Sequence, residues 1–573
     1  MADYDLIIRS GLVVDGTGGE PFVGDVAVDD GAIAAVGTLT GKGRQEIDAE
    51  GAVTAPGFVD VHTHYDGQAT WDARLQPSSW HGVTTVVMGN CGVGFAPVRP
   101  ENRDRLVELM EGVEDIPGSA LREGLTWDWK SFPDYLDVLA RRRFDVDVAA
   151  QVPHAALRVE VMGARAAAQV QATPDEAAEI ARLAGEAVRA GALGFTTSRT
   201  LNHKSSDGEL TPSYGTGQDE LVAIGRAVGE TGRGVLQVVS DFTDGEAEFE
   251  LLRQAMRAGR APMSVSLIQS NLAPDSYRRV LAFVTDCQKQ GLTIRAQVAP
   301  RPVGLLLGLQ NTLHPFMENP VWRQIADRTA ADQAKLMRTG ELRAEILAAQ
   351  SRTKNRRRIG GILIHKYELM YEVTDPPQYE PDPADTIAAR AGRLGVTPEE
   401  LAYDLLAAGD GDAMLYLTFA NYADGNLDAV KEMLEHPHTI PGLSDGGAHV
   451  GTICDGSFPT TLLGHWARDR AAGLGLPFVV QRQARDTARA VGLGDRGVLA
   501  PGYRADINVI DLQALRLRRP TMLFDLPAGG RRLMQRAEGY RHTIVAGRET
   551  YRNGEATGAL PGRLVRGPQN AAR

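Results

Sequence analysis

Gly57-Phe58-Val59-Asp60-Val61-His62-Thr63-His64 is an apolar run that ends in two histidines. Alternate residues of a β-strand point to the same side, so the imidazoles of His62 and His64 converge on one point at the end of a strand. Neutral imidazole is a common ligand of zinc and similar divalent ions. The octapeptide therefore predicts a strand with a metal site at its end, and metal-assisted hydrolysis is the leading hypothesis. The alternative is an exposed polar strand end that binds no metal.

Length and composition limit the classes of protein to consider. The 573 residues exceed the roughly 250–300 at which a single core stops growing, so at least two structural units are expected. No segment approaches the roughly 18 uninterrupted apolar residues of a membrane span. The net charge of -12 weighs against a nucleic-acid partner. The basic cluster at 354–358 is expected to be a solvated helix or loop.

The cysteines and the N-terminal residues indicate the cellular compartment in which the protein is expected. Cys91, Cys287 and Cys454 are too few and too scattered for a disulfide framework, which agrees with a reducing environment. The first residues show no basic start followed by an apolar core, as a secretory signal would. A cytoplasmic location is therefore expected, without a membrane partner.

Apolar strand candidates alternate with amphipathic helices from residue 57 onward. A helix over 174–190 is predicted, with Thr173 as its N-cap and proline at its first position, and another over 219–229. The eight expected strands are 57–64, 83–91, 146–153, 193–198, 235–242, 263–271, 293–300 and 439–445. This alternation predicts an α/β fold, a TIM-like (β/α)8 barrel whose active site lies at the carboxyl ends of the strands.

Both ends of the chain have short strands separated by glycine turns. Residues 1–56 and 497–573 are expected to pair into one composite β-sandwich, because the N-terminal segment is too short for a stable sheet of its own. The barrel would then span 57–496. The interval of about 301–438 between the last two barrel strands is too long for one crossover and is expected to hold an inserted subdomain.

Four ordered motifs carry a family resemblance over nearly the whole chain. They are Asp5-Leu6-Ile7-Ile8-Arg9, the passage at 55–64, Leu443-Ser444-Asp445-Gly446 and Gly502-Tyr503-Arg504-Ala505-Asp506. Together they resemble the amidohydrolase superfamily. Within it, Asn90-Cys91-Gly92 resembles the N-acyl-D-amino-acid deacylase, or D-aminoacylase, branch. The resemblance implies a hydrolase with one or two divalent metal ions, zinc being the expected metal.

The resemblance also implies roles for individual residues. In this branch a cysteine at the end of the second strand is a metal ligand, and Cys91 matches it. The aspartate that matches Asp445 takes a proton from metal-bound water and passes it to the leaving nitrogen. The expected metal ligands are thus His62, His64, Cys91 and Asp445, with Asp445 also as general base and acid. A cysteine that packs like alanine and an aspartate that only bonds within its turn are the alternatives.

The chain departs from the branch after the fifth and sixth strands. The deacylases carry a histidine at each of these strand ends, whereas 235–241 and 264–271 contain none. Gln237 and Gln269 offer only weak oxygen ligands, and Asp241 suits a hard cation, so none of them is an evident replacement. The usual zinc site of the branch therefore cannot be carried over whole.

Three outcomes remain open. The metal can move to a mononuclear site made by the two histidines and Asp445, with Cys91 nearby. Alternatively, His203 and Lys204, in the loop after the fourth strand, reach the centre, with Lys204 carboxylated as in other branches. In the third outcome, metal and hydrolysis have both been lost.

Further polar residues are candidates for substrate contacts. They are His449, Arg295, Gln237, Gln269 and His203. A guanidinium such as that of Arg295 can hold a substrate carboxylate bidentately. Ordinary surface charge or a polar residue at the start of a helix is the alternative for each.

The sequence thus predicts a metal-dependent hydrolase that cleaves a C–N amide bond with water. The resemblance implies a small-molecule substrate, an N-acyl-D-amino acid. Hydrolysis of another amide, a lactam, an ester or a cyclic ureide is the rival enzymatic function. A non-catalytic binding protein with a decayed metal site is the rival of another class, and homo-oligomer formation is left open.

Overall fold

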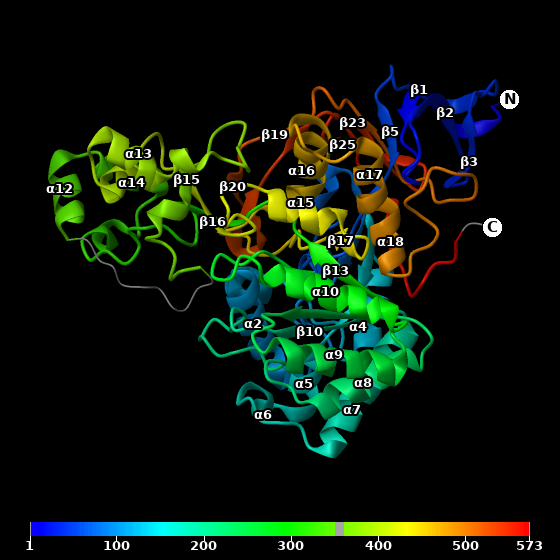
Figure 1. Ribbon diagram of the computed structural model, residues 1–573, viewed down its shortest axis with the longest axis horizontal. Coiled ribbons are helices and arrows are strands. Elements are labelled where there is room, and N and C mark those ends of the chain that lie inside the picture. The colour runs from blue at the N-terminus through cyan, green and yellow to red at the C-terminus, as the bar shows by residue number, and fades with distance from the viewer. Residues whose placement is uncertain (1, 350–359, 572–573) are drawn as a thin grey trace.

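A computed structural model describes residues 2–349 and 360–571, and the basic cluster at 354–358 lies outside this range. Figure 1 shows a main body of strands and helices, from which a lobe containing α12, α13 and α14 projects to one side. Within the described ranges, no helix combines the length and the apolar character needed to cross a membrane.

Parallel strands form the centre of the main body. Three of them form a sheet in the order β6-β7-β8, and six form another in the order β17-β13-β12-β11-β10-β9. Their bounds are β6 (Phe58–Asp60), β7 (Val83–Met88), β8 (Asp147–Ala150), β9 (Val152–Pro153), β10 (Gly194–Arg199), β11 (Val235–Ser240), β12 (Met263–Leu267), β13 (Ile294–Val298) and β17 (Thr439–Pro441). Every one of the eight expected strand regions contains a strand, and this confirms the parallel α/β fold.

The two parallel sheets meet at both of their edges. Gln151 alone separates β8 from β9 along the chain. Beyond the ends of β6 and β17, Thr63 and Gly446 form a parallel bridge. The His64 amide donates to the Gly446 carbonyl at 2.8 Å, and the Asp445 amide donates to the His62 carbonyl at 3.1 Å. These backbone bonds place the histidine pair directly beside Asp445.

Amphipathic helices cover the strands, and a capping box sets the start of one of the two helices predicted from the sequence. Helix α7 (Pro174–Ala190) begins at the predicted residue, because Thr173 and Glu176 bond reciprocally to each other's backbone amides. The other helix expected from the sequence is α8 (Gln218–Gly229). Figure 1 shows α7, α8 and α9 side by side below β10. The other helices of the main body are α1 (Gln68–Trp71), α2 (Arg103–Glu114), α3 (Gly118–Gly124), α4 (Phe132–Ala140), α5 (His154–Met162), α6 (Ala164–Ala167), α9 (Gly245–Gly259), α10 (Ser276–Lys289), α15 (Asp428–Glu435), α16 (Phe458–Thr461), α17 (Leu476–Gln481) and α18 (Thr487–Ala490).

Strands from both ends of the chain share one nine-stranded sheet. Its order is β25-β24-β23-β18-β5-β1-β2-β3, with β4 paired to β1. The bounds are β1 (Tyr4–Val13), β2 (Phe22–Asp29), β3 (Ala32–Gly37), β4 (Gly43–Asp48), β5 (Val53–Pro56), β18 (Ile507–Ile510), β23 (Tyr540–Val545), β24 (Arg548–Arg552) and β25 (Glu555–Ala556). Strand β18 pairs antiparallel with both β5 and β23. The two ends are thus joined by backbone hydrogen bonds, while the domain boundaries at 1–56 and 497–573 stay a prediction.

The projecting lobe lies between β13 and β17 in the sequence. Its strands β14 (Val303–Gly308), β15 (Met370–Glu372) and β16 (Met414–Ala420) form an antiparallel sheet. Its helices are α11 (Ala330–Met337), α12 (Gly340–Ala348), α13 (Ile387–Leu394) and α14 (Pro398–Leu406), and its buried side chains form a core of their own. Helix α15 lies inside the expected insertion but packs on β13 and β17. The insertion boundaries of 301–438 stay a prediction. Two antiparallel pairs complete the strands, β19 (Arg516–Leu517) with β22 (Ala537–Glu538) and β20 (Thr521–Leu526) with β21 (Gly530–Met534).

Candidate metal centre

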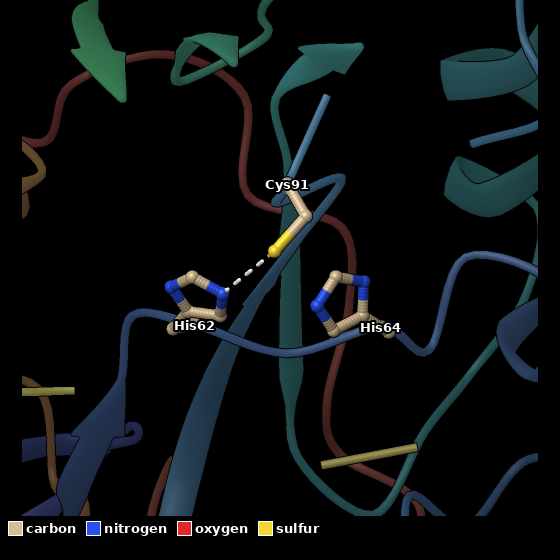
Figure 2. A group of neighbouring side chains, drawn as sticks. All are labelled: His62, His64 and Cys91. Carbon is tan, nitrogen blue, oxygen red and sulfur yellow. Dashed lines mark hydrogen bonds between the residues drawn. The ribbon is translucent and has the colours of Figure 1, made fainter. Parts of the chain in front are cut away.

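The two histidines after β6 and the cysteine after β7 face one another, as Figure 2 shows. One ligand atom from each of His62, His64 and Cys91 lies within 4.8 Å of the other two, and all three residues are buried. His62 Nε2 is 3.3 Å from Cys91 Sγ. Bonds of about 2.0–2.3 Å in a tetrahedral zinc site separate neighbouring ligand atoms by about 3.3–3.8 Å. The group therefore has the donor chemistry and spacing to hold zinc or a similar divalent ion.

Asp445 adds a carboxylate to this group from the turn after β17. Its Oδ1 lies 3.2 Å from His62 Nε2 and 3.6 Å from His64 Nε2. Burial would raise the pKa of Asp445, but the neighbouring imidazoles, first that of His64, together lower this pKa below its ordinary value. Asp445 is therefore ionised at neutral pH and suited to bind a cation.

A second residue contacts the other ring nitrogen of each histidine. His62 Nδ1 donates to Gln297 Oε1 at 2.7 Å, and Gln297 Nε2 donates to Ser264 Oγ at 3.0 Å. His64 Nδ1 lies 3.3 Å from Glu114 Oε1. Partners of this kind fix the orientation and tautomer of a metal-binding imidazole. Both rings therefore present Nε2 toward Asp445, where a cation would bind.

Glu114 is a site residue that the sequence patterns did not indicate. It ends α2, its side chain is fully buried, and neither carboxylate oxygen has a hydrogen bond within the described residues. Burial raises the pKa of Glu114 to about 8, although His64 opposes this shift. Glu108 and Glu111 recur at the same three-residue spacing on α2 and are only partly buried, so the sequence gives no signal that singles out Glu114.

Two of the expected substrate residues, His449 and His203, lie at or near the centre, and a third, Gln237, is buried in β11. His449 Nε2 is 3.5 Å from Glu114 Oε2 and 3.8 Å from Asp445 Oδ2. His203 Nδ1 is 2.8 Å from Ser198 Oγ, and burial together with the charge of His449 lowers the pKa of His203 to about 3. Gln237 is buried in β11, and its amide has no hydrogen bond to any residue that the structure describes.

The other two expected substrate residues, Arg295 and Gln269, make contacts outside the group of His62, His64, Cys91 and Asp445. Arg295 is the second residue of β13, so it lies at the amino end of the strand, and its guanidinium contacts the Pro437 carbonyl and His438 Nδ1. The histidine pair lies at the opposite, carboxyl ends of the strands. Gln269 is engaged elsewhere, since its amide donates to Asp424 at 2.7 Å and accepts from the Ala423 amide at 3.2 Å. A role of either residue in substrate binding stays a prediction.

The backbone is strained at three residues of the candidate centre. Cys91, Asp445 and His449 have φ values of 55°, 49° and 48°. Side-chain-bearing residues seldom adopt this left-handed conformation, and it persists where surrounding contacts impose it, most often at functional sites. The tight turns after β7 and β17 thus aim these groups back toward the strand ends.

Comparison with known proteins agrees with this geometry. Residues 45–551 match the amidohydrolase family. The chain is 30% identical over 542 residues to an uncharacterized protein of Mycobacterium tuberculosis, covering 89% of this chain and 84% of that one. It is 26% identical over 572 residues to the D-aminoacylase of Alcaligenes xylosoxydans xylosoxydans, covering 98% and 97% of the two chains.

A solved structure shows the same fold. The N-acyl-D-glutamate deacylase from Bordetella bronchiseptica, in complex with zinc and a phosphonate inhibitor, has a TM-score of 0.64 at 24% identity, with 98% of this chain and 99% of that chain covered. The family match covers most of the present sequence. The chain therefore belongs to the amidohydrolase family.

Proposed function

We propose that this protein is a metal-dependent amidohydrolase that removes the acyl group from N-acyl-D-amino acids. The observation that carries the proposal is the convergence of His62, His64, Cys91 and Asp445 from three parallel strands on one buried point. The substrate class rests on relatives whose names are D-aminoacylase and N-acyl-D-glutamate deacylase. Together they favour hydrolysis of an amide on an acylated D-amino acid.

We further propose that the parallel strands close into a (β/α)8 barrel with this centre at its carboxyl mouth. The short step from β8 to β9 and the bridge between Thr63 and Gly446 support closure, because they join the two parallel sheets at both edges. Catalytic groups of such barrels come from the ends of several strands. The positions of the histidine pair, Cys91 and Asp445 follow that rule.

Unsatisfied polar atoms support a cation at the centre. His64 Nε2 and Asp445 Oδ1, which lie 3.6 Å apart, are both buried without a hydrogen bond to any described residue. Leaving a buried polar atom without a hydrogen bond costs about 1–3 kcal/mol, and a cation between these two atoms would offset that cost. A divalent cation, with zinc as the expected metal, would be held by His62, His64, Cys91 and Asp445.

The proposed reaction uses the side chains in fixed roles. A bound divalent cation supplies Lewis-acid activation of a water molecule and of the acyl oxygen. Asp445 accepts a proton from the attacking water and returns it to the amine nitrogen as the C–N bond breaks. His449, whose Nε2 lies 3.8 Å from Asp445 Oδ2, orients this carboxylate. Glu114 and Gln297 keep the two imidazole rings in place.

Substitution Glu114→Gln is expected to weaken binding of the cation by about 10- to 100-fold, because it removes the carboxylate beside His64 Nδ1. Competition with a chromophoric chelator measures the affinity. The matched control is Glu111→Gln, one turn earlier on α2 and only partly buried, which should leave affinity unchanged. Equal affinity in the two variants would remove Glu114 from the support of the centre.

The substrate class is tested with matched N-acyl-D- and N-acyl-L-amino acids, read by release of the free amine. We expect turnover of the D-isomers and little of the L-isomers. Preference for the L-isomers, or no amine release from a protein loaded with metal, would refute the deacylase assignment. A second panel of other amides, lactams, esters and cyclic ureides then identifies the reaction. A protein that cannot be loaded with any divalent metal would refute the metal-dependent mechanism as well.

A further inference from the structure

A cavity lies at the amino ends of the parallel strands, away from the metal centre. Its volume is about 880 Å³, and the starts of β11, β12, β13 and β17 contribute to its wall. Six arginines from separate parts of the chain line it, namely Arg233, Arg260, Arg295, Arg482, Arg485 and Arg489. We call this space the arginine cavity.

The arginine cavity holds a large excess of positive charge. Asp486 is the one acidic residue among its lining residues, and it already contacts Arg482 at 3.5 Å and Arg485 at 3.2 Å. The chain as a whole has a net charge of -12, so this concentration of cations runs against its overall balance. Like charges that share one cavity repel each other and together attract anions.

Three of the arginines are not neutralised by neighbouring acids. Arg233, Arg260 and Arg489 are exposed at the rim, and none of them forms an ion pair with a residue in 2–349 or 360–571. Arg233 precedes β11, Arg260 precedes β12, and Arg489 lies in α18. Three unconnected segments thus bring unpaired guanidinium groups to one opening.

Arg482, which lines the arginine cavity, is held in place by hydrogen bonds but keeps one N–H group without an acceptor. It is 8% exposed, and its Nη2 donates to the carbonyls of Leu434 at 2.9 Å and His436 at 2.6 Å, which fixes the side chain. Its Nε is buried and has no acceptor among the described residues. Burial lowers the pKa of Arg482, an effect that Asp486 opposes and the charge of Arg295 reinforces. An incoming anion would satisfy this donor and relieve the repulsion between the two arginines.

The remaining wall limits the size and character of the ligand. Apolar residues form much of it, among them Leu193, Val235, Met263 and Ile440 from the beginnings of neighbouring strands. Sites for small organic molecules have volumes of about 300–1,000 Å³, and the arginine cavity falls in that range. A single phosphate ion would leave most of the space and the apolar wall without contacts.

We propose that the arginine cavity binds an organic polyphosphate of nucleotide size. The planar guanidinium group matches phosphate oxygens in a bidentate manner, and several such groups around one opening suit a chain of phosphates. The apolar wall would receive the organic part. This site is separate from the metal centre and does not depend on the reaction catalysed there.

The test is calorimetric titration of the full-length protein with ATP, with inorganic tripolyphosphate as the second probe. We expect saturable binding of ATP that weakens as salt is raised, because exposed charges are screened. Tripolyphosphate is expected to bind at least tenfold more weakly, since it offers nothing to the apolar wall. Equal affinity for the two probes would overturn the organic part of the proposal.

ATP and tripolyphosphate can also bind a metal ion held at the metal centre, and variants of the arginine cavity distinguish that binding from binding to the cavity itself. The double variant Arg260→Gln/Arg489→Gln removes two exposed side chains and is expected to weaken ATP binding at least tenfold. The matched control is Arg141→Gln/Arg143→Gln, which removes the same charge at two exposed positions outside the cavity and should bind ATP normally. Equal binding in both double variants, or no saturable binding by the unaltered protein, would overturn the proposal.

Discussion

Replacement of Asp445 by asparagine is expected to lower kcat by at least about a hundredfold, a loss typical of removed acid-base catalysis. The amide keeps the shape of the side chain and an oxygen near His62 and His64, so folding and most of the metal content should be retained. The amide cannot accept the proton of the attacking water. Turnover is measured by amine release and metal content by elemental analysis of the same preparation.

Asp410→Asn is the control for this substitution, because Asp410 is exposed and lies in the lobe region, away from the centre. It should leave kcat unchanged. Near-normal turnover of the Asp445→Asn variant would remove Asp445 from the proposed proton transfer. Loss of activity together with loss of all metal would instead limit the role of Asp445 to holding the cation.

The double variant His62→Ala/His64→Ala is expected to lose its bound cation and to fall to the background rate of hydrolysis. It removes two of the four proposed ligands, including the ring that contacts Cys91 at 3.3 Å. Extraction of the metal from the unaltered protein with a chelator should have the same effect, and added divalent ion should restore activity to that protein alone. Metal content and amine release are the two measurements.

A matched control exists within the chain. His436 and His438 are also two residues apart, and their ring centroids are 5.6 Å apart, as are those of His62 and His64. They lie between α15 and β17, at the amino end of that strand. The variant His436→Ala/His438→Ala should keep its metal and its activity. Equal metal loss in the two double variants would show that the pair after β6 holds no cation.

The strands could be predicted because their signal is local. Apolar runs bounded by glycine and helical segments identified all eight strand regions, and Thr173 identified the start of α7. The meeting of His62, His64 and Asp445 also followed from the sequence, since the carboxyl ends of parallel strands lie at one edge. Alternation along a strand and the direction of the chain suffice for this part of the site.

The parts that could not be predicted depend on contacts between distant segments. Glu114 enters the centre because the end of α2 packs against the turn that contains His449, whose amide donates to the Glu114 carbonyl. The spacing of polar and apolar residues along α2 does not indicate that contact. Arg295 lies near the amino end of both the expected strand 293–300 and the observed β13, so strand direction alone already places it away from the carboxyl ends. The arginine cavity likewise draws on segments that are remote in sequence.

The shared sheet has a consequence for biosynthesis. Strand β5 leads through Gly57 directly into β6 and the histidine pair, yet one of its hydrogen-bonded neighbours, β18, ends at Ile510. A ribosome must therefore translate past residue 510 before β5 acquires that neighbour. Nascent polypeptides generally fold from the amino terminus as they emerge. Here β5 cannot complete its pairing until β18 has been synthesised. Premature termination ahead of β18 would therefore leave the strand that leads into the histidine pair without one of its hydrogen-bonded neighbours.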